Sequence, residues 1–176
     1  MQRHKITDDF YLDEFTRSQT AARYGIDNTV KYGGAVYTNI RRLCRDVLQP
    51  VRDHIGAVIN VSSGYRSLKL NRRVGGVDTS QHVSGLAADI NASGKTPMQL
   101  ARDIDDLKIC REIEFDQLIL EFGQWVHISI AAEGTTPRGE ILTAVKVPRL
   151  MRKPKTVYIF GLHTQSEALE IALKTR

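Results

Sequence analysis

The sequence predicts an α+β fold in which helices flank a small antiparallel sheet. Three observations indicate this class. Apolar residues recur at helical spacing over 40–48, and Thr96 followed by Pro97 is typical of the start of a second helix. Two strand-like runs, 115–121 and 125–130, are separated by three residues, as in a β-hairpin. A chain of 176 residues that is 41% hydrophobic suits one compact domain.

The N-terminal part of the chain is predicted to be a lead that wraps the domain and precedes a long helix. Residues 1–35 mix polar, charged and glycine residues without a sustained period. The amphipathic helix begins near Thr38, is interrupted by Pro50 and continues in a kinked form to His54. Gly56 ends this helical stretch.

The middle of the chain alternates short strands with loops that carry polar residues. A β-branched run at 58–61 predicts a strand that leads into the loop Ser62–Arg66, and 68–74 predicts a helical turn. Residues 86–90 read as a buried strand, and the helix that begins at Thr96 runs to about residue 108. An arginine at the end of a strand makes the first loop a candidate functional site.

The C-terminal part changes in composition after a predicted strand at 140–147. We therefore divide the chain into a domain of residues 1–147 and an extension of residues 148–176. The extension combines a basic linker with a strand at 157–162 and a helix at 166–173; the basic residues are Arg149, Arg152, Lys153 and Lys155. Two interpretations remain open: a docking appendage, or a strand and helix packed on the same core.

Charge and composition limit the classes of partner. The net charge of +5 suits an anionic partner, but the basic residues are scattered and no nucleic-acid-binding motif accompanies them, so no nucleic acid is expected. No apolar run is long enough to insert into a membrane, and the basic N-terminus lacks the apolar stretch of a secretory signal. Cys44 and Cys110 are too few for a disulfide framework, and we expect both to be core thiols of a protein made in the cytoplasm.

Two histidines and an aspartate form a candidate zinc site. His82 and Asp89 lie seven positions apart with Gly85 between them, so a loop histidine and a strand aspartate can converge on one ion. Strand alternation places His127 with Trp125 on a polar face and turns the apolar neighbours toward the core. A carboxylate in so apolar a strand needs a compensating cation. A satisfied core histidine, a salt-bridged aspartate and a surface loop histidine would equally fit the spacing alone.

One motif resembles a known enzyme family. Residues 80–89 match the pattern S-x-H-x-x-G-x-A-x-D of the zinc D-alanyl-D-alanine peptidase family, and residues 125–129 resemble its tryptophan-containing strand, which supplies the third ligand. The family includes phage L-alanyl-D-glutamate endolysins and shares its fold with the Hedgehog signalling domain. The resemblance covers most of residues 8–147 and implies a zinc ion in a cleft on the sheet, held by His82, Asp89 and His127.

The same resemblance implies roles for other residues. Arg66 would bind the substrate or polarise its scissile carbonyl, with a salt-bridged structural arginine as the alternative. Ser80 and Trp125 would contact the bound substrate. Many members of the family carry Asp or Glu three residues before the last histidine, where this chain has Gln124. Glu121 is the nearest acidic substitute and is therefore the candidate general base. Asp116 is a candidate structural partner.

These expectations define a zinc metallopeptidase that hydrolyses an amide bond in the peptide stem or cross-link of bacterial peptidoglycan. Its type would be a D,D-carboxypeptidase or an endolysin-like endopeptidase, and the resemblance suggests a phage or prophage origin. The expected partners are peptidoglycan and either phage structural proteins or a holin that permits export to the cell wall. The alternative is a catalytically weak or inactive virion, tail or wall-binding protein that retains the fold and the zinc.

Overall fold

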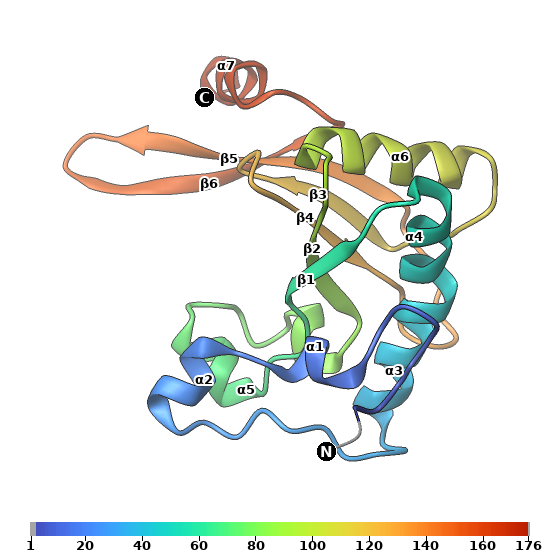
Figure 1. Cartoon of the computed structure of the whole chain (residues 1–176). Helices are drawn as coiled ribbons and strands as arrows, with labels where there is room; N and C mark the ends of the chain where they lie inside the picture. The colour runs from blue at the N-terminus through green and yellow to red at the C-terminus, as the bar shows by residue number, and fades with distance from the viewer. Residues whose placement is uncertain (1–2, 176) are drawn as a thin grey trace.

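The computed structural model describes residues 3–175, which form seven α-helices, a π-helical turn, a 3-10 turn and six strands (Figure 1). The helices and turns are α1 (Leu12–Thr16), α2 (Gln19–Tyr24), α3 (Ala35–Leu43), η1 (Cys44–Leu48), α4 (Gln49–Ile55), α5 (Leu68–Arg73), η2 (Gln81–Ser84), α6 (Pro97–Ile109) and α7 (Gln165–Lys174). The strands are β1 (Ile59–Ser63), β2 (Ala87–Ala92), β3 (Gln117–Glu121), β4 (Trp125–Ser129), β5 (Glu140–Arg149) and β6 (Arg152–Phe160). The α+β class is confirmed.

The sheet is mixed, so the prediction of a small antiparallel sheet was wrong in this respect. Its six strands run in the order β1-β2-β4-β3-β5-β6, and β5 pairs with β3 in parallel. Because β2 occupies one edge of β4, the free edge of the β3–β4 hairpin is the outer edge of β3, and the next strand adds there. Glu140 pairs with Gln117, so β5 starts where β3 starts and runs in the same direction.

The long N-terminal helix passes through Pro50 without stopping. The backbone N–H of Gln49 donates to the carbonyl of Cys44, which is the wider spacing of a π-turn. Proline lacks an N–H and its ring clashes with the carbonyl four residues earlier, so a π-turn just before it relieves the conflict. The expected kinked continuation therefore extends through α4 to Ile55.

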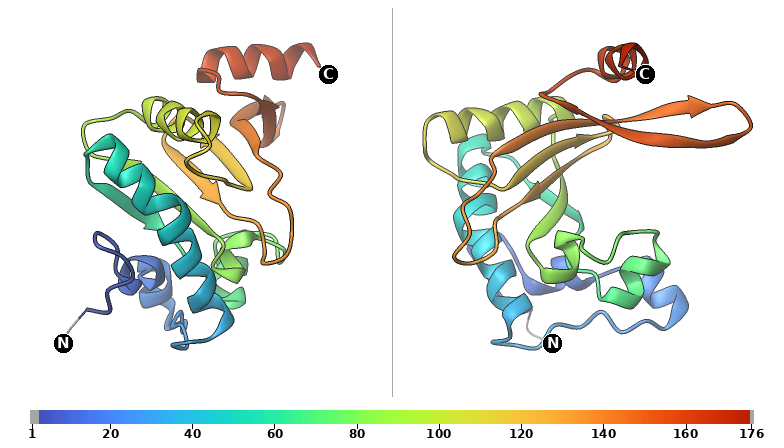
Figure 2. Two further views of the ribbon diagram at one scale, coloured as in Figure 1. Left: turned by 90° about the vertical axis from the view of Figure 1, so that its right-hand side faces the viewer. Right: turned by 180° about the vertical axis from the view of Figure 1, so that it is seen from behind.

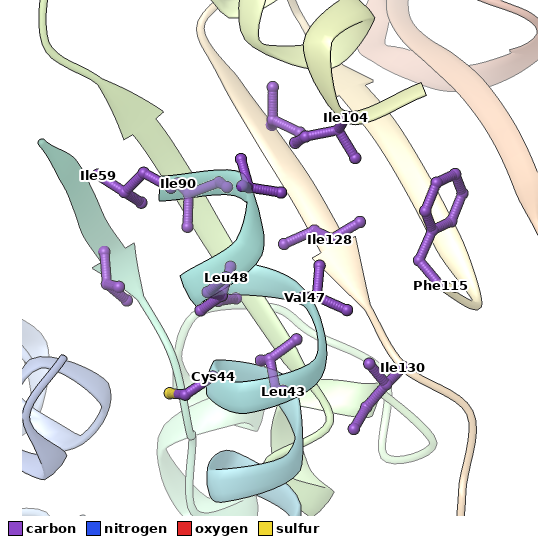
Figure 3. Close-up of a cluster of buried hydrophobic side chains, with 14 of the residues drawn as sticks. Leu43, Cys44, Val47, Leu48, Ile59, Ile90, Ile104, Phe115, Ile128 and Ile130 are labelled. Carbon is purple, nitrogen blue, oxygen red and sulfur yellow. The ribbon is translucent and has the colours of Figure 1, made fainter. Parts of the chain in front are cut away.

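One face of the sheet forms the main hydrophobic core. Figure 3 shows Leu43, Val47 and Leu48 of the long helix against Ile90 of β2 and Ile128 of β4. Helix α6 covers the same face. Its N-cap is Thr96, as the sequence predicted, and the Thr96 hydroxyl accepts from the Gln99 N–H. The strand alternation in β2 and β4 is confirmed, because the apolar positions join this core and the polar ones face away.

Short helices border the sheet near β1. Helix α1 packs on β1 and buries Phe15 in the main core, while α2 and α5 lie together below the sheet (Figures 1 and 2). A small cluster of Ala21, Ile26 and Leu70 joins α2 to α5. The predicted N-terminal lead therefore supplies one wall of the cleft described below.

The C-terminal residues continue the sheet instead of leaving it through a linker. The basic residues predicted as a linker lie in a β5–β6 hairpin that projects beyond the other strands (Figure 2). Pro154 is tolerated there because β6 is an edge strand. Helix α7 packs on this hairpin in a separate small cluster whose buried members are Val145, Val147, Ala168 and Ala172.

Deleting α7 should destabilise the hairpin without unfolding the domain. Removal of residues 164–176 uncovers Val145 and Val147, and exposing buried valines costs roughly 1.5–3 kcal/mol each when exposure is complete. We expect a loss of about 2–4 kcal/mol in the free energy of unfolding, measured by urea denaturation. Unchanged stability together with lost binding to cell wall or to a partner would instead favour the docking interpretation.

The two cysteines differ in their exposure to solvent. Cys44 is buried, but Cys110 is exposed at the C-terminus of α6, so the prediction that both cysteines are core thiols was wrong for Cys110. Among the helices of residues 3–175, none combines the length and apolar character needed to cross a bilayer.

Candidate metal centre

Three buried side chains from separate elements converge on the open face of the sheet. His82 lies on η2, Asp89 on β2 and His127 on β4, and each is less than a tenth exposed. Asp89 and His127 are direct partners across the β2–β4 ladder, so their side chains share one face. The convergence expected from the sequence is therefore present.

The three side chains present their ligating atoms at the spacing of a metal site. Asp89 Oδ1 lies 3.1 Å from His127 Nδ1 and 3.2 Å from His82 Nε2, and the two nitrogens are 3.2 Å apart. Tetrahedral zinc with bonds of about 2.0–2.1 Å places neighbouring ligand atoms about 3.3–3.4 Å apart. The observed triangle is close to that size, and these residues form a group that could hold a metal ion.

The hydrogen-bond chemistry of this group also fits a cation. His82 Nδ1 lies 2.7 Å from the carbonyl oxygen of Gly64, which can only accept, so Nδ1 carries the proton and Nε2 presents a lone pair. When both histidines are neutral, the only proton available among Asp89 Oδ1, His82 Nε2 and His127 Nδ1 is the one on His127 Nδ1. The three atoms therefore cannot all be satisfied by hydrogen bonds to one another. A bound cation would satisfy all three, and an imidazole N–H held by a backbone carbonyl is typical of metal-binding histidines.

The second oxygen of Asp89 binds Arg66. Arg66 Nη2 donates to Asp89 Oδ2 over 2.7 Å, and its Nε donates to the hydroxyl of Ser63 over 2.9 Å. Burial raises the pKa of Asp89, but the neighbouring His82 and His127 outweigh burial and hold that pKa far below its usual range. Arg66 thus orients the carboxylate while also lining the cleft, so both roles considered for it are compatible with its position.

Two glycines allow the chain to bring His82 and its acceptor into place. Gly85, the glycine of the motif, has φ +70°, and a Cβ there would lie 2.9 Å from the carbonyl oxygen of Val36 in α3. Gly64 approaches α1 so closely that a Cβ would lie 2.6 Å from the Cα of Phe15. The first glycine lets the chain turn from η2 into β2, and the second positions the carbonyl that holds His82.

A polar network supports the segment that carries His82. Asp116 Oδ2 accepts from Gln81 Nε2 over 2.9 Å, and both oxygens of Asp116 accept from Arg138, including its backbone N–H. Gln81 immediately precedes His82, so the network connects the start of η2 to the loop before β5. The structural role expected for Asp116 agrees with these contacts.

Replacing Asp116 by Asn should make stability less dependent on pH in the acidic range. Hydrogen bonds from Arg138 outweigh burial and lower the pKa of Asp116 below that of the unfolded chain, about 3.9. This contribution is present above pH 4 and disappears as the pH falls through the folded-state pKa. We expect Asp116→Asn to lose roughly 1–3 kcal/mol at pH 7 and less at pH 3, measured by urea unfolding of metal-free proteins. A loss that stays constant from pH 7 to pH 3 would contradict this assignment.

Glu121 lies on the same face as the candidate metal ligands. It is opposite Trp125 in the β3–β4 hairpin, and His127 is paired with Ile119, two positions away on the same side. Burial raises the pKa of Glu121, and the charge of Asp89 raises it further, while His127 and Arg66 oppose them. Gln124 is exposed in the hairpin turn and does not line the cleft, whereas Glu121 does.

An open cleft of about 1460 Å³ gives access to the centre. It runs from α2 and α5 to the sheet, and its lining includes His82, Asp89, His127, Arg66, Glu121, Ser80 and Trp125. The Trp125 ring packs edge-on against Phe122, and its buried indole N–H has no acceptor among the described residues. All candidate site residues therefore line one cleft.

Three residues around this site were not identified from the sequence. Gly64 acts through a backbone carbonyl, so its residue type carries no signal for that role. Arg138 lies in a loop, and its ion pair with Asp116 depends on a contact between segments 22 residues apart. Tyr158 lines the cleft because β6 joins the sheet through β5, and a correct prediction of strand order could have identified it.

Comparison with known families agrees with this geometry. The model of the family Peptidase M15 matches residues 8–129, which include all three candidate ligands, Arg66 and Glu121. A comparison with curated protein sequences gives no significant match. The match covers well over half of the 176 residues, and the buried His82, Asp89 and His127 provide a suitable metal site. The chain therefore belongs to the Peptidase M15 family of zinc metallopeptidases, the family of D-alanyl-D-alanine carboxypeptidases and related endolysins.

Proposed function

We propose that this protein hydrolyses an amide bond in the peptide stem or cross-link of bacterial peptidoglycan. The observation that supports it best is the arrangement of three metal-ligand side chains, an acid and a cation along one open cleft. Zinc peptidases use three protein ligands and leave a further position for water, together with a carboxylate that can accept a proton. Membership of the Peptidase M15 family favours peptidoglycan as the substrate.

Each candidate site residue in the cleft has a proposed role. His82, Asp89 and His127 would hold Zn²⁺, which supplies an activated water and polarises the scissile carbonyl. Glu121 accepts the proton of the attacking water and returns it to the leaving amine. A raised pKa suits a residue that must both take and give a proton near neutral pH.

Arg66 contributes positive charge beside the three candidate ligands, with Nη2 lying 2.7 Å from Asp89 Oδ2 and 3.5 Å from His82 Nε2. Its guanidinium is fixed by Ser63 and Asp89, so it can attract the carbonyl oxygen of a substrate without reorganising. Ser80 and Trp125 line the same cleft and would contact the peptide.

Two substrate types follow from this proposal, and one experiment distinguishes them. A carboxypeptidase must recognise the free carboxylate of the terminal D-alanine, whereas an endopeptidase cuts an internal bond. The test compares a stem pentapeptide with a free carboxyl terminus and the same peptide with a terminal amide. Loss of cleavage on amidation indicates a D,D-carboxypeptidase; equal cleavage at an internal bond indicates the endolysin type.

The route to the cell wall is a further part of the proposal. We infer a phage or prophage protein made in the bacterial cytoplasm, which reaches the wall through a holin or acts there as part of a phage particle. The basic hairpin would favour contact with anionic wall polymers, because residues 141–166 carry five cations and no acidic residue. The alternative is a virion or wall-binding protein with little turnover, which the glutamine at position 124 favours.

A further inference from the structure

A second groove continues the cleft along the outer strands of the sheet. It has a volume of about 450 Å³ and is lined by Gln117, Ile119, Arg138, Glu140, Leu142, Tyr158 and Phe160. We call it the aromatic groove. Four of these residues, Gln117, Ile119, Arg138 and Tyr158, also line the main cleft, so the two spaces are continuous. A substrate held in the cleft can therefore extend into the groove.

Strand register fixes the distance between this groove and the metal centre. His127 pairs with Ile119, Ile119 with Leu142, and Leu142 with Phe160, so these side chains form one row on the open face. Three strand spacings separate His127 from Phe160, about 14 Å in all. Tyr158 lies two spacings from Glu121 in the next row, about 10 Å away. The aromatic end of the groove is thus too far away to contact the scissile bond, but it is within reach of the part of the substrate next to that bond.

Two aromatic side chains that line the groove are strongly exposed. Phe160 is 75% exposed and Tyr158 is 52% exposed, and both stand on the same face of β6 because they are two residues apart. On the neighbouring strands, Leu142 and Ile119 continue the row from Phe160 and belong to a small apolar cluster on the open face. Adjacent exposed aromatic rings beside an apolar cluster offer flat surfaces for a ligand.

The rim of the groove is polar and carries no net charge. Gln117 Nε2 donates to Glu140 Oε2 over 2.6 Å, and Arg138 Nη1 lies 3.3 Å from the same oxygen. One amide, one carboxylate and one guanidinium can donate to and accept from hydroxyl and acetamide groups. A charged ligand would find no excess of opposite charge there, and a purely apolar one would bury the polar rim without hydrogen bonds.

We propose that the aromatic groove binds an N-acetylated pyranose of the glycan strand, adjacent to the peptide in the main cleft. The C–H face of the sugar ring stacks on Tyr158 and Phe160, and its hydroxyl and acetamide groups bond with the rim. This inference rests on the proposed action on peptidoglycan and adds that the enzyme recognises glycan as well as peptide. The groove lies largely outside the residues that match the family.

Direct binding tests the groove independently of hydrolysis. The uncharged probe N,N′-diacetylchitobiose is titrated into the zinc-loaded protein and amide shifts are followed by NMR. We expect shifts centred on residues 140–144 and 157–161, with affinity at least tenfold weaker in Phe160→Ala. The matched control is Tyr32→Ala, which removes an aromatic ring that is 69% exposed and lines neither cavity. Shifts elsewhere, no shifts at millimolar sugar, or equal affinity in Phe160→Ala would overturn the proposal.

Rates of hydrolysis then distinguish a groove that does not bind sugar from a protein that does not cleave peptidoglycan peptides. We compare kcat/KM for a stem peptide attached to its disaccharide with kcat/KM for the same peptide alone. Phe160→Ala should lower the ratio of the two values by about tenfold, and Tyr32→Ala should leave that ratio unchanged. Wild-type protein that cleaves neither substrate refutes the proposed function, while the sugar titration still decides whether the groove binds saccharide. Shifts in the groove on raising protein concentration without sugar would assign it to self-association instead.

Discussion

Asp89→Ala is expected to remove both bound zinc and peptidase activity. The substitution deletes one of the three side chains proposed to hold zinc and leaves Arg66 without the carboxylate that holds it. Loss of an outer partner alone typically weakens metal binding about 10–100-fold, and loss of a ligand should cost more. Zinc content measured by mass spectrometry of dialysed protein should fall well below one ion per chain, and hydrolysis should fall to background.

The matched control for this variant is Asp78→Ala. Asp78 also pairs with an arginine, since Arg72 Nη2 lies 2.6 Å from Asp78 Oδ2, but this pair is exposed at the surface. We expect it to keep zinc and activity, because an exposed ion pair contributes little to stability and Asp78 lies outside the candidate metal centre. If Asp89→Ala retained full zinc content and full activity, the assignment of the metal site would be wrong.

Glu121→Gln is expected to abolish turnover while zinc remains bound. Glutamine has nearly the same shape but cannot accept a proton, and removing a general base typically costs about 10²–10⁴ in rate. Zinc content should stay near one ion per chain, because Glu121 is not one of the three converging ligands. The fall should appear in kcat, measured on a stem peptide, with little change in KM.

Two further variants test whether the position of the acid is correct. Adding Gln124→Glu to Glu121→Gln should not restore turnover, because residue 124 is exposed in the turn and does not line the cleft. Glu133→Gln, at an exposed site, should behave as wild type. Recovery through Gln124→Glu would move the general base to the position usual in the family, and unchanged rates in Glu121→Gln would favour the virion or wall-binding alternative.

The sequence was sufficient for local features and for the three side chains that converge in the candidate metal centre. Helix α6 and the β3–β4 hairpin follow from capping and turn residues, which act over a few positions. The spacing within residues 80–89 and the alternation around His127 indicated the three ligands before any contact was known. These features succeed because each depends on neighbours in the chain.

The features that were missed depend on pairing between distant segments. The parallel β3–β5 pair results from β2 occupying the edge of β4, which no local pattern encodes. The basic segment after Pro148 reads as a linker by composition, yet edge-strand pairing makes it a hairpin. The contact of Arg66 with Asp89, and that of Asp116 with Arg138, likewise required the folded arrangement.

Digestion of purified peptidoglycan by the zinc-loaded protein, with released fragments identified by mass spectrometry, tests the proposed function directly. We expect fragments whose new termini lie at one peptide bond of the stem or cross-link, with the glycan chain intact and with no release by Glu121→Gln. Free D-alanine would identify a carboxypeptidase, and released stems or separated cross-links an endopeptidase. Absence of any fragment from protein carrying one zinc per chain, or cleavage confined to the glycan, would refute the proposed peptidase function.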